Sequence, residues 1–212
     1  MKGLLIKDIR MMGQQRTVLV SMIGISILMA FTLEGSFLPG YLSLMAGITA
    51  IGTVTYDEAD NGFQFLFTLP VDCRTYVREK YVFCIGMLLA GAVLGTAMEL
   101  VRNAFTGGSF GGLEEAAVLP LVMVLMIAVM IPLQLKFGAE RARVILMMIY
   151  GGIAVLAFLA SRLMSSSQPP AFILALDQVS PTLVLCCIAA VIAVLTLLSY
   201  LCSVRIMEKK EF

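Results

Sequence analysis

The stretch AAVLPLVMVLMIAVMIPLQL, Ala116–Leu135, decides the fold class of this chain because it contains no charged residue. An α-helix rises about 1.5 Å per residue, so a helix of about 20 residues crosses a hydrocarbon core of about 30 Å. Five more apolar runs of similar length occur: Thr17–Leu33, Phe37–Tyr56, Tyr81–Val101, Val144–Leu163 and Pro181–Val204. The sequence therefore predicts an all-α polytopic membrane protein with six transmembrane helices.

The cations between these runs are strongly one-sided. Counted along the chain, four precede the first run, three lie between the second and third, three lie between the fourth and fifth, and three follow the sixth. Only two cations fall on the other side: Arg102, just after the third run, and Arg162, near the outer end of the fifth run. Cytoplasmic loops of membrane proteins carry an excess of Lys and Arg, so we expect a multi-pass protein of the cell membrane with both termini in the cytoplasm.

Composition leaves little room for a soluble domain. The 212 residues are 60% hydrophobic and only 14% charged, whereas soluble domains average about 25% charged residues. We divide the chain into an N-terminal interfacial amphipathic helix at 1–16, a six-helix transmembrane domain at 17–204 and a cytoplasmic tail at 205–212. The first run is too long for an ordinary signal peptide, so we expect an uncleaved anchor.

The segment MKGLLIKDIRMMGQQR, Met1–Arg16, supports the interfacial helix. Helical spacing places Lys7, Arg10 and Gln14 on one face. It places Leu5, Ile9 and Met12 on the opposite face. Such a helix lies in the membrane surface with its apolar side toward lipid.

Several enzyme classes are excluded by residue type. The chain has no histidine, which removes histidine acid–base catalysis, HExxH zinc chemistry and Ser–His or Cys–His catalysis. The five cysteines form no CxxC pair, and we interpret them as small apolar residues rather than a disulfide framework or metal site. No GK[ST] phosphate-binding motif is present. We therefore expect neither an enzyme nor a cofactor-binding or nucleic-acid-binding protein.

Charge within the runs is scarce, which argues against an ion-coupled carrier. Glu99 and Arg102 lie near the outer end of the third run, where an i, i+3 pair at the interface is the simplest interpretation. The same run contains Gly91 and Gly95, a GxxxG spacing that lets helices approach closely. These glycines suit packing within the chain or a dimer seam equally well.

The longest inner connection, 57–80, belongs to the stretch YDEADNGFQFLFTLPVDCRTYVREKYVF, Tyr56–Phe83. It begins acidic, continues through closely spaced phenylalanines, breaks at a proline and ends in a basic helix. An apolar anchor among charges is the pattern expected of a protein-docking segment. The residues that we assign to this role are Asp57, Glu58, Phe63, Phe65, Phe67, Pro70 and Arg74.

This stretch resembles the membrane subunit of ABC-2-type ABC transporters, in the small six-span permease group. The tyrosine and acids at 56–58, the Thr-Leu-Pro-Val step at 68–71 and the basic helix ending Lys80–Tyr81 carry the resemblance. Two departures are Asp72–Cys73, where a serine with a basic neighbour is more usual, and Gly62–Phe63, which interrupts the first loop helix.

The resemblance implies a permease subunit without an ATPase of its own. ATP and Mg²⁺ would be bound by a dimer of separate cytoplasmic ATPase subunits, which would move the spans through the 57–80 loop. A second permease copy or a paralogue would complete the path. Export is favoured, and an apolar path suits amphipathic or hydrophobic substrates such as peptides. The alternatives are a non-transporting membrane scaffold or sensor subunit, and an ion-coupled secondary carrier.

Overall fold

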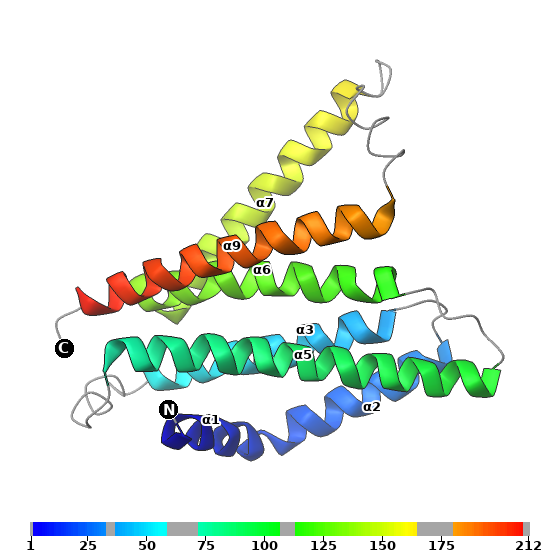
Figure 1. Ribbon diagram of the computed structural model, residues 1–212, viewed down its shortest axis with the longest axis horizontal. Coiled ribbons are helices and arrows are strands. Elements are labelled where there is room, and N and C mark those ends of the chain that lie inside the picture. Colours follow the sequence, from blue (N-terminus) through cyan, green and yellow to red (C-terminus); the bar gives the residue numbers. More distant parts are fainter. Residues whose placement is uncertain (1, 33–36, 59–71, 107–112, 165–179, 210–212) are drawn as a thin grey trace.

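A computed structural model describes residues 2–32, 37–58, 72–106, 113–164 and 180–209 (Figure 1). Within these residues all regular secondary structure is helical, which confirms the predicted fold class at that level. The helices are α1 (Lys2–Gln14), α2 (Arg16–Thr32), α3 (Phe37–Glu58), α5 (Cys73–Thr106), α6 (Leu113–Phe137), α7 (Ala139–Met164) and α9 (Pro181–Glu208).

Helices α3 and α5 pack against each other at the centre of the molecule. Of the most apolar window of α3, 61% is buried inside the chain. Gly91 and Gly95 of α5 allow this close approach, because a Cβ atom on Gly91 would lie 2.6 Å from the Leu42 carbonyl oxygen. On Gly95 it would lie 2.8 Å from the Leu38 carbonyl oxygen. The two glycines thus face α3 of the same chain.

Helix α5 combines the predicted third span with the basic helix before it. It runs for 34 residues without a break, which is about 51 Å and exceeds a hydrocarbon core by about 20 Å. Asp72 immediately precedes it, and the Asp72 carbonyl accepts a hydrogen bond from the Tyr76 amide at 3.0 Å. The helix predicted at the end of the 57–80 loop is therefore continuous with the third span.

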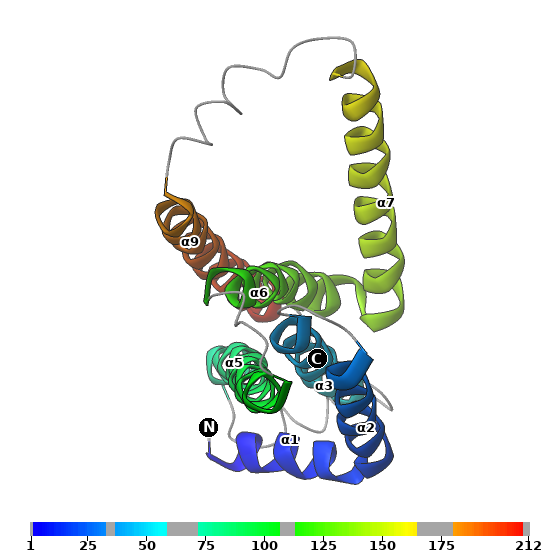
Figure 2. The same cartoon turned by 90° about the vertical axis from the view of Figure 1, so that its right-hand side faces the viewer.

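Helix α1 lies across one end of this pair, which we term the α1 end (Figure 2). The last turn of α3 and the first turns of α5 meet α1 there, through Lys7 with Asp57 and Asp8 with Lys80. The end of α9 reaches the same place, where Glu208 pairs with Arg74 at the start of α5. Helix α1 and the end of α9 therefore share one end of the molecule.

Four described helices are long and apolar enough to cross a membrane: α3, α5, α6 and α9. Helix α2 contributes a shorter apolar segment, Arg16–Ala30. Helix α7 leaves the bundle at a steep angle from the α1 end (Figures 1 and 2). The chain is thus an integral membrane protein by these four helices, while spans at α2 and α7 rest on the sequence.

Gly138 separates α6 from α7. Its φ angle is +84°, a left-handed conformation that glycine adopts without steric cost. The Gly138 amide donates to the Gln134 carbonyl at 2.9 Å and so terminates α6. The Gly138 carbonyl then accepts from Ala142 at 3.0 Å and begins α7. One residue therefore redirects the chain between the two helices.

Candidate functional site

The buried face of α1 is built around a carboxylate. Leu4, Asp8 and Met12 are spaced at i, i+4 and i+8 and are all buried, with Asp8 at 0% exposure. Of the residues predicted to form the apolar, lipid-facing side, Ile9 is 61% exposed on the surface of the chain and Met12 is buried. Asp8 faces the interior of the molecule because it pairs with a cation on α5.

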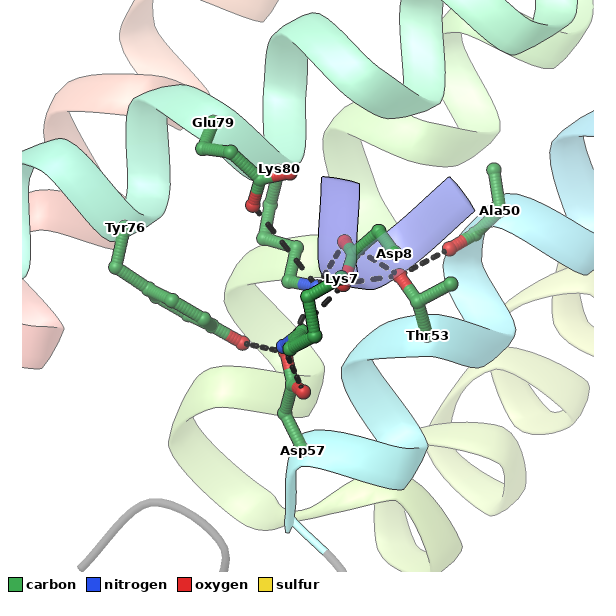
Figure 3. Close-up of polar contacts among 8 residues, drawn as sticks. All are labelled: Lys7, Asp8, Ala50, Thr53, Asp57, Tyr76, Glu79 and Lys80. Atoms are coloured by element: carbon green, nitrogen blue, oxygen red, sulfur yellow. Dashed lines mark hydrogen bonds and ion pairs between the residues drawn. The ribbon is translucent and has the colours of Figure 1, made fainter. Parts of the chain in front are cut away.

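That cation is Lys80, which is almost completely buried (Figure 3). The Lys80 ammonium pairs with Asp8 Oδ2 and lies 2.7 Å from Asp57 Oδ2 on α3. It also donates to Thr53 Oγ1 at 3.2 Å. Lys80 therefore binds α1 and α3 to α5 through a single charged group.

Asp57 closes the network at the last turn of α3. Its Oδ1 atom pairs with the Lys7 ammonium, and its Oδ2 atom accepts a hydrogen bond from the Tyr76 hydroxyl at 3.1 Å. The Lys80 ammonium also lies 5.5 Å from the centre of the Tyr76 ring, within the range of a cation–π contact. We call these residues the charge network: Lys7, Asp8, Thr53, Asp57, Tyr76 and Lys80.

Burial makes this network sensitive to the loss of any member. Burying a charge is unfavourable unless it is paired, and removing one partner of a buried pair costs about 3–5 kcal/mol. Here two ammonium groups oppose Asp8 and Asp57. Glu79 adds a third carboxylate, 4.0 Å from the Lys80 ammonium. Both Glu79 oxygens are buried and have no hydrogen-bond partner among the described residues. The cluster therefore carries more carboxylates than cations.

Glu58, the neighbour of Asp57, connects α3 to a fourth helix. Its Oε2 atom accepts a hydrogen bond from the Ala139 amide at 2.7 Å. Ala139 is the first residue of α7, where backbone amides lack helical partners and favour negative charge. Gly138 accommodates the carboxylate, because a Cβ there would lie 2.5 Å from Glu58 Oε1. Glu58 thus caps α7 from the end of α3.

Asp57 and Glu58 therefore form a hub. Asp57 contacts α1 and α5, and Glu58 contacts α7. Both are the final residues of α3 and directly precede segment 59–71. The last two residues of α3 thus join it to α1, α5 and α7.

The remaining predicted loop residues are placed as follows. Arg74 lies at the start of α5, and its Nε atom pairs with Glu208 of α9 at 2.7 Å. This pair is exposed on both sides, unlike the charge network. Phe63, Phe65, Phe67 and Pro70 lie outside the described residues.

The sequence analysis missed the inner partners of Asp57. Thr53 with Asp57 on α3, and Tyr76 with Lys80 on α5, are each i, i+4 pairs that place polar groups on one helical face. The spacing 4, 8, 12 on α1 does the same for Asp8. An aspartate within a basic N-terminal segment, opposite a lysine at a span boundary, is the signal that could have identified them.

One of three comparisons with known proteins identifies a family for this chain. The sequence profile of a family described as ABC-2 family transporter protein matches residues 3–208. Neither curated proteins nor solved structures gave a match. The matched range includes every described helix apart from the first residue of α1. The chain therefore belongs to the ABC-2 family of transporter membrane proteins.

Proposed function

We propose that the chain is the permease subunit of an ABC exporter for amphipathic or hydrophobic substrates such as peptides. A dimer of separate cytoplasmic ATPase subunits, which hold ATP and Mg²⁺, drives it. Membership of the ABC-2 family supports association with such an ATPase. Two copies of the chain, or one copy and a paralogue, enclose the path in the membrane.

The observation that carries the proposal is the hub at the end of α3. Segment 59–71 follows Glu58 directly and leads into α5 at Cys73. Its two ends are therefore tied to α1, α3, α5 and α7 through Asp57, Glu58 and Lys80. A partner that binds this segment and displaces it would therefore move these four helices as well as the segment itself.

The apolar walls of the cavities between helices support the proposed substrate class. A cavity of about 310 Å³ lies between α5 and α6 and is lined almost entirely by apolar side chains, including Leu88, Val93 and Leu121. A cavity of about 360 Å³ between α2, α3 and α5 has similar walls. Such surfaces favour apolar groups over ions, which supports amphipathic cargo and opposes an ion-coupled carrier.

The test is ATPase stimulation in reconstituted vesicles. The chain is co-reconstituted with its ATPase, and hydrolysis is measured for the wild type, Phe65→Asp and Glu58→Lys. We expect both variants to insert normally and to lose most of the stimulation. Arg143→Gln is the control, because it removes an exposed charge of α7 that lies outside the 57–80 loop. Equal stimulation by all four proteins would contradict the docking role of the loop.

A transport assay separates the proposal from its alternatives. Inside-out vesicles that contain the permease and the ATPase should accumulate a labelled amphipathic peptide only when ATP is hydrolysed. Accumulation that persists without ATP but follows an ion gradient would identify a secondary carrier. No accumulation under either condition, with the ATPase bound, would identify a scaffold or sensor subunit.

A further inference from the structure

Glu79 of α5 is a buried carboxylate that lies next to the charge network. It is 0% exposed, and neither of its carboxylate oxygens has a hydrogen-bond partner among the described residues. Its side chain lies beside that of Lys80, and Glu79 Oε2 is 4.0 Å from the Lys80 ammonium (Figure 3). That distance is too long for a hydrogen bond. A charged carboxylate in such a place is unfavourable unless it is paired more closely or takes up a proton.

The charges around Glu79 do not balance. The cluster holds three carboxylates and two ammonium groups, which are those of Asp8, Asp57 and Glu79 and those of Lys7 and Lys80. Both ammonium groups already pair with the two aspartates, and the Lys80 ammonium lies 2.7 Å from Asp57 Oδ2. Glu79 is therefore the carboxylate that is left over. One proton on it would bring the sum of these five charges to zero.

The groups that act electrostatically on Glu79 come from three helices. They are Lys7 and Asp8 on α1, Asp57 on α3, and Tyr76, Lys80 and Cys84 on α5. Glu79 itself belongs to the inner connection 57–80, which precedes the apolar run of α5. Burial raises the pKa of its carboxyl to about 7, while the Lys80 ammonium opposes this shift and the Asp8 carboxylate favours it. A carboxyl with this pKa exchanges its proton near neutral pH.

We propose that Glu79 is a proton-binding site and that its proton controls how firmly Lys80 holds α1. With the proton bound, the Lys80 ammonium stays with Asp8 and Asp57. When the proton passes to water, the Glu79 carboxylate competes for the same ammonium from the adjacent position on α5. Asp8 then loses part of its pairing, and α1 is held less firmly against α5. The proposal rests on the charge network and does not depend on the proposed transport.

The sign of the pH dependence follows from linkage. In the unfolded chain a glutamate releases its proton near pH 4.3, whereas Glu79 in the folded chain releases it near pH 7. The folded chain therefore holds the extra proton between these values, so its stability falls as the pH rises through this window. Between about pH 6 and pH 8 the unfolding constant of the wild type, relative to that of Glu79→Gln, should rise about tenfold.

Infrared spectroscopy in D₂O detects the proton directly. The folded wild type in lipid vesicles should show the carbonyl stretch of a protonated carboxyl, and this band should disappear as the pH is raised through about 7. Glu79→Gln should lack the band. Glu140→Gln is the control, because it removes an exposed carboxylate of α7, and it should keep the band. Far-UV circular dichroism checks that each variant is folded.

Hydrogen exchange measures the hold on α1. The readout is the protection factor of the α1 amides, which corrects for the pH dependence of the intrinsic exchange rate. In the wild type it should fall by up to about tenfold between about pH 6 and pH 8, because the opened state releases the Glu79 proton more readily. In Glu79→Gln it should stay constant, and in Glu140→Gln it should fall as in the wild type.

Three outcomes would overturn the proposal. A protonated-carboxyl band that persists in Glu79→Gln but is lost in Asp8→Asn would place the proton on Asp8. Absence of the band from the wild type at both pH values would mean that Glu79 stays charged in the fold. A band that titrates as expected, with protection of α1 that does not change with pH, would mean that the proton does not control the hold on α1.

Discussion

Helices α3 and α9 are both apolar enough to span a membrane, yet α3 is mostly buried within the chain and α9 is mostly exposed. Of the most apolar window of α3, 61% is buried within the chain, compared with 6% for α9. Helix α3 carries small residues and a polar last turn, whereas α9 carries exposed branched side chains such as Leu183, Val191 and Leu198. Hydropathy alone cannot separate an interior helix from a helix that faces lipid or another subunit. Polar pairing and close glycine contacts with a neighbouring helix can distinguish the two kinds of helix.

The two helices also differ in how they are tied at the α1 end. Asp57 of α3 is buried and paired with two ammonium groups. Glu208 of α9 makes an exposed pair with Arg74. Buried pairs respond strongly to the loss of a partner, whereas exposed pairs contribute about 0.2–1 kcal/mol. We therefore expect substitutions in the buried pairs at the end of α3 to lower stability much more than substitutions in the exposed pair at the end of α9.

The largest effect is expected from Lys80→Met. It leaves Asp8 and Asp57 buried beside a single cation and should lower the free energy of unfolding by about 3–5 kcal/mol. Unfolding in a titration with sodium dodecyl sulphate, followed by circular dichroism, measures this. Glu79→Gln is the matched control: it removes a neighbouring carboxylate that has no hydrogen-bond partner among the described residues, and should leave stability unchanged or raised. Equal losses in both variants would contradict the charge network.

Gly95→Ala should have the next largest effect. The new Cβ would meet the backbone of Leu38 and Pro39, and overpacking of this kind costs about 1–3 kcal/mol. Gly86→Ala on the same helix meets nothing within 4 Å, so it should stabilise by about 0.5–1 kcal/mol through helix propensity. The opposite signs would be visible in thermal unfolding. A stabilising Gly95→Ala would show that α3 and α5 are farther apart than described.

Glu58→Ala should have a moderate effect. It removes the acceptor for the Ala139 amide, and loss of a helix cap costs about 0.5–2 kcal/mol. Glu58→Gln keeps an acceptor oxygen and should lose less. Hydrogen exchange at the first turn of α7 provides a local readout, with faster exchange expected in Glu58→Ala. If exchange there is unchanged, α3 does not cap α7.

The smallest effect is expected from Arg74→Gln. Its side chain is 75% exposed and that of Glu208 is 42% exposed, so the pair should contribute less than about 1 kcal/mol and less still at high salt. Unfolding at low and high ionic strength checks this. A loss of unfolding free energy comparable to that of Lys80→Met would contradict the contrast between the buried pairs of α3 and the exposed pair of α9.

The sequence predicted the helices better than their contacts. Each apolar run that the structure describes is helical, because a backbone in lipid must satisfy its own hydrogen bonds. The inward-facing side of α1 was harder to predict: the sequence placed the apolar face toward lipid but did not identify Asp8 as buried, because its partner Lys80 lies on another helix. The role of Glu58 was equally hidden, because it depends on Gly138, 80 residues later in the chain.

The loop at 57–80 shows the same limit. Its acidic start was interpreted as flanking a docking surface, and in the structure Asp57 and Glu58 contact the chain's own helices. Sequence spacing gives the face of a residue on its own helix, but not the element that meets this face. In the proposed mechanism these two residues transmit movement, while docking falls to the segment that follows them.

A double-mutant cycle between Asp8 and Lys80 tests most directly whether buried charge joins α1 to α5. The free energies of unfolding of the wild type, Asp8→Asn, Lys80→Met and the double variant are compared. The structure predicts that the double variant loses less stability than the sum of the single losses, with a coupling energy of about 1–3 kcal/mol. Losses that add within about 0.5 kcal/mol would contradict a direct pair between these helices.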